Sequence, residues 1–225
     1  KFFNYGEHPE TNIDGSFAGM VQVSEKYDGH LGIIFQYNGK FFITTRGSFL
    51  SRTSKIATEM LTKIVEKSKW NEVYNKDGSN LTPQTTILVE IIHPETQVLT
   101  DYDNAKKFVL IGAYGNVSLM DYDSIELASV AKLLSLEVTE SHSEKGIIKT
   151  LKKVNNPKLC DKEGYVVRLS NGTRIKFKFT RYIGKMVAEK LSYSYIMKRL
   201  IDGNLKRMID NLPEEVFATA QDMIA

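Results

Sequence analysis

The sequence predicts an α+β protein with a largely antiparallel sheet. Hairpin signals occur in both halves of the chain, and amphipathic helix patterns are interspersed with short apolar strands. Strict β-α-β alternation is missing, which disfavours a parallel, doubly wound sheet. The phosphate-binding loop of P-loop enzymes, the dinucleotide fingerprint and the Gly-x-Ser-x-Gly elbow are missing too, so those site types are not expected.

The individual elements follow from local patterns. Asn38-Gly39 favours the positive φ angles of a tight turn, which predicts a hairpin of strands 30–36 and 40–45. Apolar residues recur every three or four positions over 53–70, as on one face of a helix. The remaining expected elements are strands 86–92, 108–113 and 116–120, a second hairpin of 164–169 and 173–179, and helices over 124–136, 185–201 and 214–223. Asp123 and Glu126 are placed as an N-terminal capping pair for the helix over 124–136.

The composition is that of a soluble globular chain large enough for one large domain or two small ones. Its 225 residues are 42% hydrophobic and 25% charged, with five prolines. One cysteine and four scattered histidines give no zinc-type cluster, so we expect no structural zinc and a reducing compartment. Without a signal segment or a long apolar run, a cytoplasmic protein with no membrane partner is expected.

Charge is distributed unevenly along the chain. Residues 145–208 contain 17 Lys and Arg against 4 Asp and Glu, whereas the rest of the chain contains 13 against 23. Such an asymmetry favours a polyanionic partner, either nucleic acid or nucleotide phosphate, at the later part of the chain. A solvated basic helix face would give the same pattern.

The first candidate for chemistry is Lys26, in the sequence Lys-Tyr-Asp-Gly at 26–29. It precedes the first hairpin, where a rigid sheet can hold a loop side chain in place. An ordinary surface lysine before an Asp-Gly turn is the alternative. A second candidate is Glu90, the one carboxylate in the strand 86–92, whose apolar sequence predicts burial on both faces. An unpaired buried carboxylate costs several kcal/mol.

The second hairpin adds further candidates. Lys176 and Lys178 are two residues apart on a strand and therefore share one face, while Phe177 and Phe179 share the other. Glu163 stands at the start of the partner strand. A carboxylate beside two amines suits a metal-bound phosphate as well as a structural ion pair.

Five collinear motifs resemble those of the covalent nucleotidyltransferases, the superfamily of ATP-dependent DNA and RNA ligases and capping enzymes. They are Lys-Tyr-Asp-Gly at 26–29, Thr-Arg-Gly-Ser at 45–48, Leu-Val-Glu-Ile at 88–91, Glu-Gly-Tyr-Val-Val at 163–167 and Lys-Phe-Lys at 176–178. Within the superfamily, the stretches at 1–4, 92–94 and 101–102, together with Tyr182, are similar to the phage-type RNA ligase 1 and fungal tRNA ligase adenylyltransferase group. The resemblance implies an antiparallel-sheet, ATP-grasp-like ligase domain, with a cytoplasmic or phage-encoded protein working in the host cytoplasm.

The same resemblance implies roles for the candidate residues. The neutral amine of Lys26 would attack the α-phosphate of ATP, with Lys176, Lys178 and Mg²⁺ stabilising the charge, and Mn²⁺ as an alternative ion. Glu163 would hold the metal through water. Six residues would bind the nucleotide: Lys1, Arg46, Glu90, Ile111, Val166 and Tyr182. Glu90 would accept a ribose hydroxyl, whereas Ile111, Val166 and Tyr182 are explained equally well as core residues.

The implied activity is that of an ATP-dependent RNA ligase. AMP would pass from Lys26 to an RNA 5′-phosphate, and a 3′-hydroxyl, as in a nicked tRNA, would then displace it. We expect an adenylyltransferase domain over 1–182, a helical extension over 183–225 and a monomer. Several cations and two tyrosines of the later segment would line an RNA phosphate track: Lys185, Lys190, Tyr193, Tyr195, Lys198, Arg199, Lys206 and Arg207.

Three alternatives remain open from the sequence. A DNA ligase and a GTP-using mRNA capping guanylyltransferase share the same covalent step. Only 47 residues follow Lys178, however, which is short for the separate OB-fold domain that those enzymes carry. The third alternative is a non-catalytic RNA-binding module, for which the basic segment alone would suffice.

Overall fold

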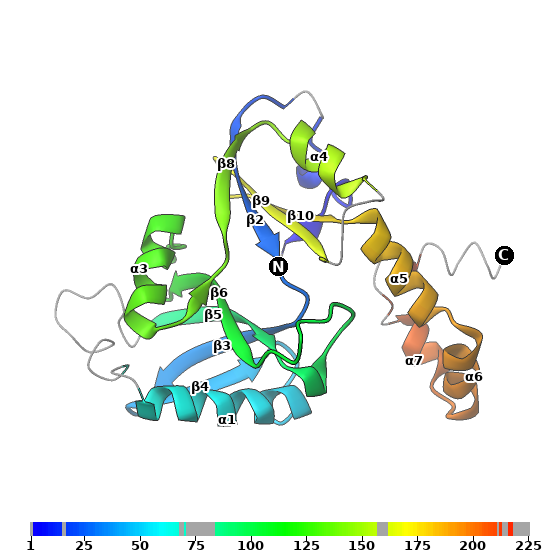
Figure 1. Cartoon of the computed structure of the whole chain (residues 1–225), viewed down its shortest axis with the longest axis horizontal. Helices are drawn as coiled ribbons and strands as arrows, with labels where there is room; N and C mark the ends of the chain where they lie inside the picture. The colour runs from blue at the N-terminus through cyan, green and yellow to red at the C-terminus, as the bar shows by residue number, and fades with distance from the viewer. Residues whose placement is uncertain are drawn as a thin grey trace. The chain divides into compact units, whose positions relative to one another are not determined.

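The computed structural model describes residues 2–14, 17–67, 70, 84–156, 162–210, 212 and 216–217. The chain divides into two compact units (Figure 1). The first unit comprises Lys1–Lys26 and His142–Ala225, and the second comprises Tyr27–Ser141. Each contains a five-stranded sheet with helices, which confirms the α+β class but replaces the single expected sheet with two.

The sheet of the first unit has the order β1-β10-β9-β2-β8. β9 lies between β10 and β2 and is antiparallel to both, while β1 runs parallel to β10. The strands are β1 (Phe3–Asn4), β2 (Met20–Lys26), β8 (Ser141–Lys145), β9 (Gly164–Leu169) and β10 (Arg174–Lys178), with a short 3-10 helix at Pro9–Thr11. The second expected hairpin is therefore confirmed, and Gly172 in its turn has a φ of +86°, a region that glycine adopts without steric cost.

Side chains alternate across this sheet in the way that strand geometry requires. Val23, Val167 and Ile175 are in register on the three central strands and are buried. The opposite face carries more polar residues and includes Lys26, Lys176 and Lys178. The pleat thus separates an apolar core face from a basic face.

Four helices belong to the first unit among the residues described. They are α4 (Ile148–Val154), α5 (Thr180–Lys190), α6 (Tyr193–Ile201) and α7 (Leu205–Asp210). The single helix predicted over 185–201 is wrong, because Ser192 has extended backbone angles between α5 and α6. Its hydroxyl donates to the carbonyl of Glu189, a local bond that competes with helix continuation. Of the helix predicted over 214–223, only residues 216–217 are described, and both are helical.

The sheet of the second unit has the order β4-β3-β5-β6-β7. Its strands are β3 (His30–Tyr37), β4 (Lys40–Thr45), β5 (Thr85–Ile92), β6 (Lys107–Gly115) and β7 (Glu137–Val138). All neighbours are antiparallel except β6 and β7, which are parallel. Asn38 and Gly39 both have positive φ angles, so the predicted tight turn between β3 and β4 is confirmed.

Helices α1 (Arg52–Lys67) and α3 (Ser124–Leu134) supply the core of the second unit together with one face of its sheet. Trp70, which is fully buried, donates its indole N–H to the carbonyl of Leu134 at 2.9 Å. The expected capping pair of α3 is confirmed: Asp123 accepts from the N–H of Glu126, whose side chain accepts from the N–H of Asp123.

Two strand predictions need correction. Residues 116–120 form a turn instead of a strand, because the N–H of Leu119 donates back to the carbonyl of Gly115 and Leu119 takes a φ of +55°. β5 is not buried on both faces. Ile87, Val89 and Ile91 are buried, whereas Glu90 on the other face is half-buried.

Candidate active site

The register of the first unit's sheet aligns two of the predicted catalytic lysines. Lys26 at the end of β2 and Lys178 at the end of β10 are both in register with Gly164, the first residue of β9. Residues in register share a face of the sheet. The two amines therefore project from the same face, on either side of the central strand.

Glu163 links these amines by electrostatics. Its Oε2 accepts a hydrogen bond from Nζ of Lys26 at 2.6 Å, and its Oε1 lies 3.7 Å from Nζ of Lys178. The side chain of Glu163 is only 7% exposed, against 20% for Lys26 and 12% for Lys178. The two amines compensate the negative charge of this nearly buried carboxylate. The carboxylate in turn fixes the positions of both nitrogens.

Gly164 allows this close arrangement. A Cβ atom at this position would collide with the carbonyl oxygen of Phe177 and approach Cα of Lys178 to 2.8 Å. The absence of a side chain therefore permits β9 and β10 to approach each other next to Glu163.

The same face carries further cations along the hairpin. Lys176 is in register with Val166, and Arg174 is in register with Arg168, all of them half-buried. Phe177, on the other face, is 2% exposed, so the predicted alternation of β10 is confirmed. The lysines and arginines form a basic surface suited to phosphate.

In the second unit, Glu90 contacts the backbone of the lysine motif. Its Oε1 accepts a hydrogen bond from the N–H of Gly29 at 3.1 Å, and a Cβ at Gly29 would approach Cγ of Glu90 to 3.0 Å. Gly29 is three residues after Lys26. The carboxylate in the apolar strand is thus explained in part by a backbone partner, and its position on the half-buried face leaves it partly accessible.

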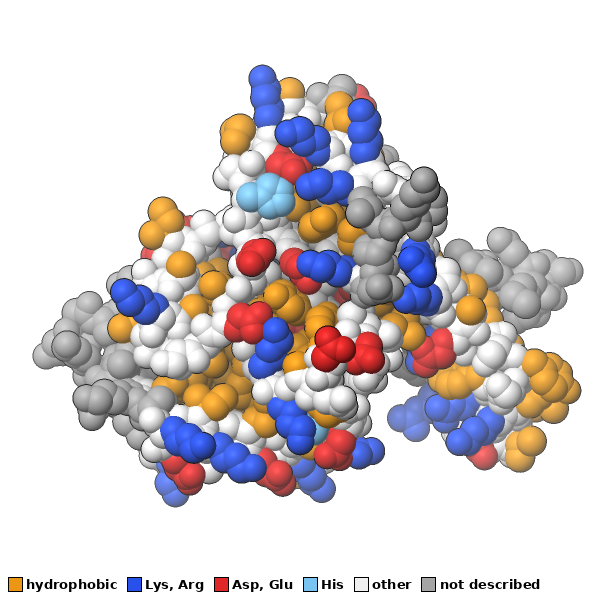
Figure 2. Space-filling view, in the orientation of Figure 1, with side chains coloured by type: hydrophobic (Ala, Val, Ile, Leu, Met, Phe, Trp, Pro, Cys, Tyr) orange, Lys and Arg blue, Asp and Glu red, His pale blue; other side chains and the backbone are white. Residues whose placement is uncertain are grey.

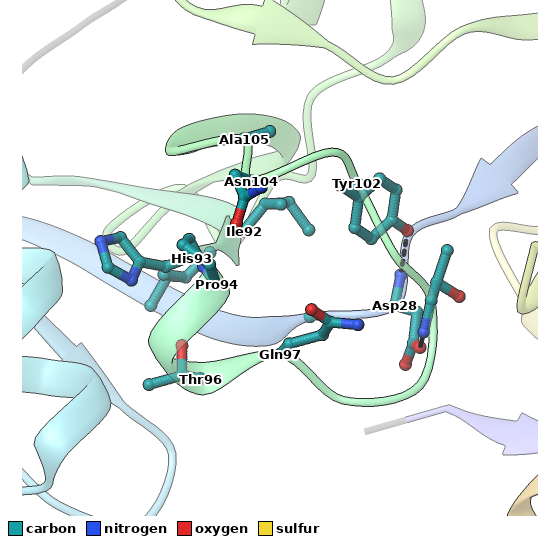
Figure 3. A pocket seen from close by; sticks show the side chains of 12 residues that line it. Asp28, Ile92, His93, Pro94, Thr96, Gln97, Tyr102, Asn104 and Ala105 are labelled. Carbon is teal, nitrogen blue, oxygen red and sulfur yellow. Dashed lines mark hydrogen bonds between the residues drawn. The ribbon is translucent and has the colours of Figure 1, made fainter.

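Asp28 of the lysine motif is hydrogen-bonded to a distant segment of the chain. Its Oδ2 accepts from the N–H groups of Leu99 and Thr100, at 2.9 and 2.7 Å, and its own N–H donates to the hydroxyl of Tyr102 at 2.8 Å (Figure 3). The side chains of Tyr27 and Tyr102 also stack, with ring centroids 6.1 Å apart. Asp28 and Tyr102 both lie in the motifs quoted above, but their contact joins positions 74 residues apart, which local patterns do not reveal.

A small cavity of about 10 Å³ lies beside Asp28, between the strand end at Ile92 and the short 3-10 helix Pro94–Thr96 (Figure 3). This volume is close to that of one water molecule and far below that of a nucleotide site. On its wall, burial lowers the pKa of His93, with the positive charge of Lys106 acting in the same direction. The neutral ring fits the contact made there, because its Nδ1 accepts from the N–H of Glu95.

The remaining predicted residues are distributed over both units. Arg46 is exposed in the loop after β4, and Ile111 is the residue skipped in the β5–β6 register at a bulge. Tyr182, in α5, is 4% exposed. Val166 is half-buried on the basic face of the first unit, and Lys1 lies outside the described residues. Lys26, Glu163 and Lys178 are thus brought together, whereas Arg46, Glu90 and Ile111 belong to the second unit.

Within the described part of the chain, no group of three or more His, Cys, Asp or Glu side chains is arranged to hold a metal. Glu163 is therefore a single candidate carboxylate. Magnesium sites of this kind are common where the substrate's phosphates supply the other oxygens. No helix among the described residues has the length and apolar character needed to cross a membrane.

A family model described as RNA ligase matches residues 1–183. No curated protein matches the sequence significantly. Among solved structures, an archaeal ATP-dependent RNA ligase is similar with a TM-score of 0.61 at 15% identity, covering 91% of this chain and 56% of that chain.

Two further structures have similar folds. A Naegleria gruberi RNA ligase gives a TM-score of 0.55 at 16% identity, covering 75% of this chain and 52% of that one. A putative ATP-dependent DNA ligase from Aquifex aeolicus gives 0.56 at 16% identity, covering 91% and 52%. The chain thus spans about half the length of these similar proteins.

Proposed function

The chain belongs to the RNA ligase family, whose model matches residues 1–183, and from this premise we propose that it is an ATP-dependent RNA ligase acting through a lysyl-AMP intermediate. The observation that carries the proposal is the arrangement of Glu163 between the amines of Lys26 and Lys178. A surface lysine without function would not require a nearly buried carboxylate beside it.

The first step forms one bond and breaks one. The neutral amine of Lys26 attacks the α-phosphorus of ATP, the N–P bond forms, the P–O bond to the β-phosphate breaks, and pyrophosphate leaves. The attacking nitrogen releases one proton to water in the same step, which balances the reaction. Lys178 and Lys176, on the same face of the sheet, stabilise the charge that develops on the phosphate oxygens, an effect of roughly 3 kcal/mol for one well-aimed group.

The residues present fit a divalent ion. Glu163 offers one carboxylate, and ATP would supply further oxygens, which is the usual pattern for Mg²⁺. When bound, the ion would neutralise charge on the phosphates. A Naegleria gruberi RNA ligase variant of similar fold was solved with ATP and Mn, which supports ATP with Mg²⁺ or Mn²⁺ as the ligands proposed here.

We also propose nucleotide contacts for several further residues. Glu90 would accept a ribose hydroxyl, Arg46 would contact phosphate, and the apolar side chains of Ile111 and Val166 would pack against adenine. The partial exposure of Glu90 and of Val166 supports these roles, since fully buried groups could not reach a ligand. We propose nucleotide contacts for Lys1 and Tyr182 from the family resemblance, although Tyr182 is only 4% exposed.

The following steps concern RNA. The 5′-phosphate of an RNA strand attacks the lysyl-AMP and takes the AMP, releasing the amine of Lys26. A 3′-hydroxyl then attacks the activated phosphate, forms the phosphodiester and releases AMP. We propose RNA ends of this chemistry as the substrate, with a nicked tRNA as the specific case, residues 1–182 as the adenylyltransferase region and 183–225 as a helical extension.

Nucleotide transfer tests the proposal. The chain is incubated with Mg²⁺ and with ATP or GTP labelled in the α-phosphate, and acid-labile label on the protein is measured. We expect label from ATP, its loss in Lys26→Ala, and a strong reduction in Lys178→Ala. The control Lys152→Ala removes an exposed cation on α4 and should keep the wild-type rate.

A chase with nucleic acid completes the experiment. Nicked RNA carrying a 5′-phosphate should remove the label and become sealed, whereas an equivalent nicked DNA should not. Label from GTP alone would indicate a capping guanylyltransferase, and sealing of DNA in preference to RNA would indicate a DNA ligase. RNA binding without any labelled protein would indicate a binding module.

A further inference from the structure

A basic cavity lies among the three C-terminal helices that the structure describes in full. It has a volume of about 360 Å³, in the range of sites that take small ligands. Lys190, Arg199 and Arg207 line it, one from each of α5, α6 and α7. Figure 2 shows Lys and Arg side chains gathered over α6 and α7 at the lower right.

An aromatic side chain orients two of these cations. The ring centroid of Tyr195 lies 5.5 Å from Nζ of Lys190 and 5.1 Å from Cζ of Arg199. Tyr195 and Arg199 are four residues apart on α6, so helix geometry brings them onto one face. The break at Ser192 starts a new helix between Lys190 and Tyr195. The cations are therefore held by cation–π contacts toward a common cavity.

The described lining of the cavity is basic. None of its lining residues, all within the described part of the chain, is acidic, although Lys190 also lies 4.0 Å from Glu189 on the helix surface. Like charges gathered in one place repel each other, and a bound phosphate relieves the repulsion. Arg199 and Arg207 have planar guanidinium groups that bind phosphate oxygens in pairs.

We propose that this cavity binds a backbone phosphate of the RNA strand, as an RNA anchor separate in sequence from the candidate active-site residues. The proposal rests on the RNA ligase function proposed above. The phosphate of a strand is favoured over a free nucleotide for two reasons. First, two cations already contact the ring of Tyr195, so the ring is not available to stack on a base. Second, the exposed cations Lys198 on α6 and Lys206 on α7 extend the basic surface beyond the cavity. An extended polyanion complements such a surface.

The contact should be insensitive to base sequence, because phosphate carries no sequence information. The affinity of the full chain for fluorescently labelled single-stranded oligo(U) and oligo(A) RNA is measured by anisotropy over a salt series. Arg199→Gln should weaken the affinity for each RNA about tenfold, the scale of one charge-assisted hydrogen bond. It should also reduce the magnitude of the slope of log affinity against log salt concentration by about 0.7. The matched variant Lys152→Gln, with its exposed cation on α4, should differ little from wild type.

Two controls separate the possible failures. Circular dichroism and adenylylation of Lys26 in the same preparations report folding and the proposed function. If wild type never takes up AMP, the ligase proposal fails. If it takes up AMP but Arg199→Gln binds RNA as wild type does, the cavity assignment is wrong. The assignment also fails if ATP competes with RNA in wild type but not in Arg199→Gln, since the cavity would then be a nucleotide site.

Discussion

Glu163 accepts a hydrogen bond from Nζ of Lys26 at 2.6 Å, although the two residues are 137 positions apart in the sequence. The antiparallel pairing of β2 with β9 brings them together, because Lys26 is in register with Gly164. The geometry of the candidate nucleophile thus depends on the sheet of the first unit and on a glycine that lets two strands approach closely.

The charge of Glu163 should matter more than its shape. Glu163→Gln keeps the size of the side chain but removes the negative charge that holds the amines and, in the proposed mechanism, the metal. We expect the rate of lysyl-AMP formation to fall by about 10²-fold, as when one preorganised electrostatic group is lost. Labelled-ATP uptake measures the rate. Glu59→Gln on the exposed side of α1 is the control, and an equal rate in both variants would contradict the role of Glu163.

Gly164→Ala should displace β10 from β9, because the new Cβ would collide with the backbone at Phe177. We expect a loss of stability of roughly 1–3 kcal/mol, together with loss of adenylylation. Gly184→Ala, in α5, has open space around the added methyl and should stabilise the helix by about 0.5–1 kcal/mol. Urea unfolding compares the variants. Equal stability of the two would show that the close approach at Gly164 is unimportant.

Tyr102→Phe removes the hydroxyl that accepts the N–H of Asp28 and leaves the ring in place. The expected cost in unfolding free energy is about 1 kcal/mol. Adenylylation should fall several-fold while the affinity for RNA is retained, because only the segment that follows Lys26 loses a contact. Tyr114→Phe, on the exposed end of β6, is the matched control. A wild-type rate in Tyr102→Phe would mean that this hydrogen bond does not position the lysine motif.

Glu144 should make stability depend on pH. Burial alone would raise the pKa of this carboxyl, but hydrogen bonds from His142 and Lys153 outweigh it, and the net pKa is lowered. A lowered folded-state pKa means that the ionised group stabilises the fold above the unfolded-state pKa of about 4.3, and that this contribution is lost as the pH falls through the folded-state pKa.

Glu144→Gln should therefore cost roughly 1–3 kcal/mol near neutral pH, and its difference from wild type should shrink in acid. Urea unfolding at several pH values measures this difference. The control Glu140→Gln removes an exposed carboxylate, and its unfolding free energy should differ little from that of wild type at any pH. A pH-independent cost at Glu144 would rule out the charged hydrogen bonds as its source.

Local signals in the sequence predicted the parts of the fold that local forces determine. The turn at Asn38-Gly39, the cap of α3 at Asp123 and the alternation around Phe177 each depend on a few neighbouring residues. The strands β2 and β8 and the helix α4 were not predicted. β2 pairs with residues more than 130 positions away, and no local pattern specifies that pairing.

The candidate site was predictable in composition but not in geometry. Motif spacing pointed to Lys26, Glu163 and Lys178, and the structure brings these three together. The contacts of Asp28 with Leu99, Thr100 and Tyr102 could not be foreseen, because they join a turn to a distant loop. The cavity at Tyr195 depends on a helix break that apolar periodicity did not indicate.

Mass spectrometry of the adenylylated chain tests the central claim most directly. The protein is incubated with ATP and Mg²⁺, digested under mildly alkaline conditions that preserve the phosphoramidate, and analysed by tandem mass spectrometry. The account predicts one AMP group on the peptide that contains Lys26, attached to that side chain and missing from Lys26→Ala. An AMP group attached to a different lysine, or none on any peptide after incubation with ATP, would contradict it.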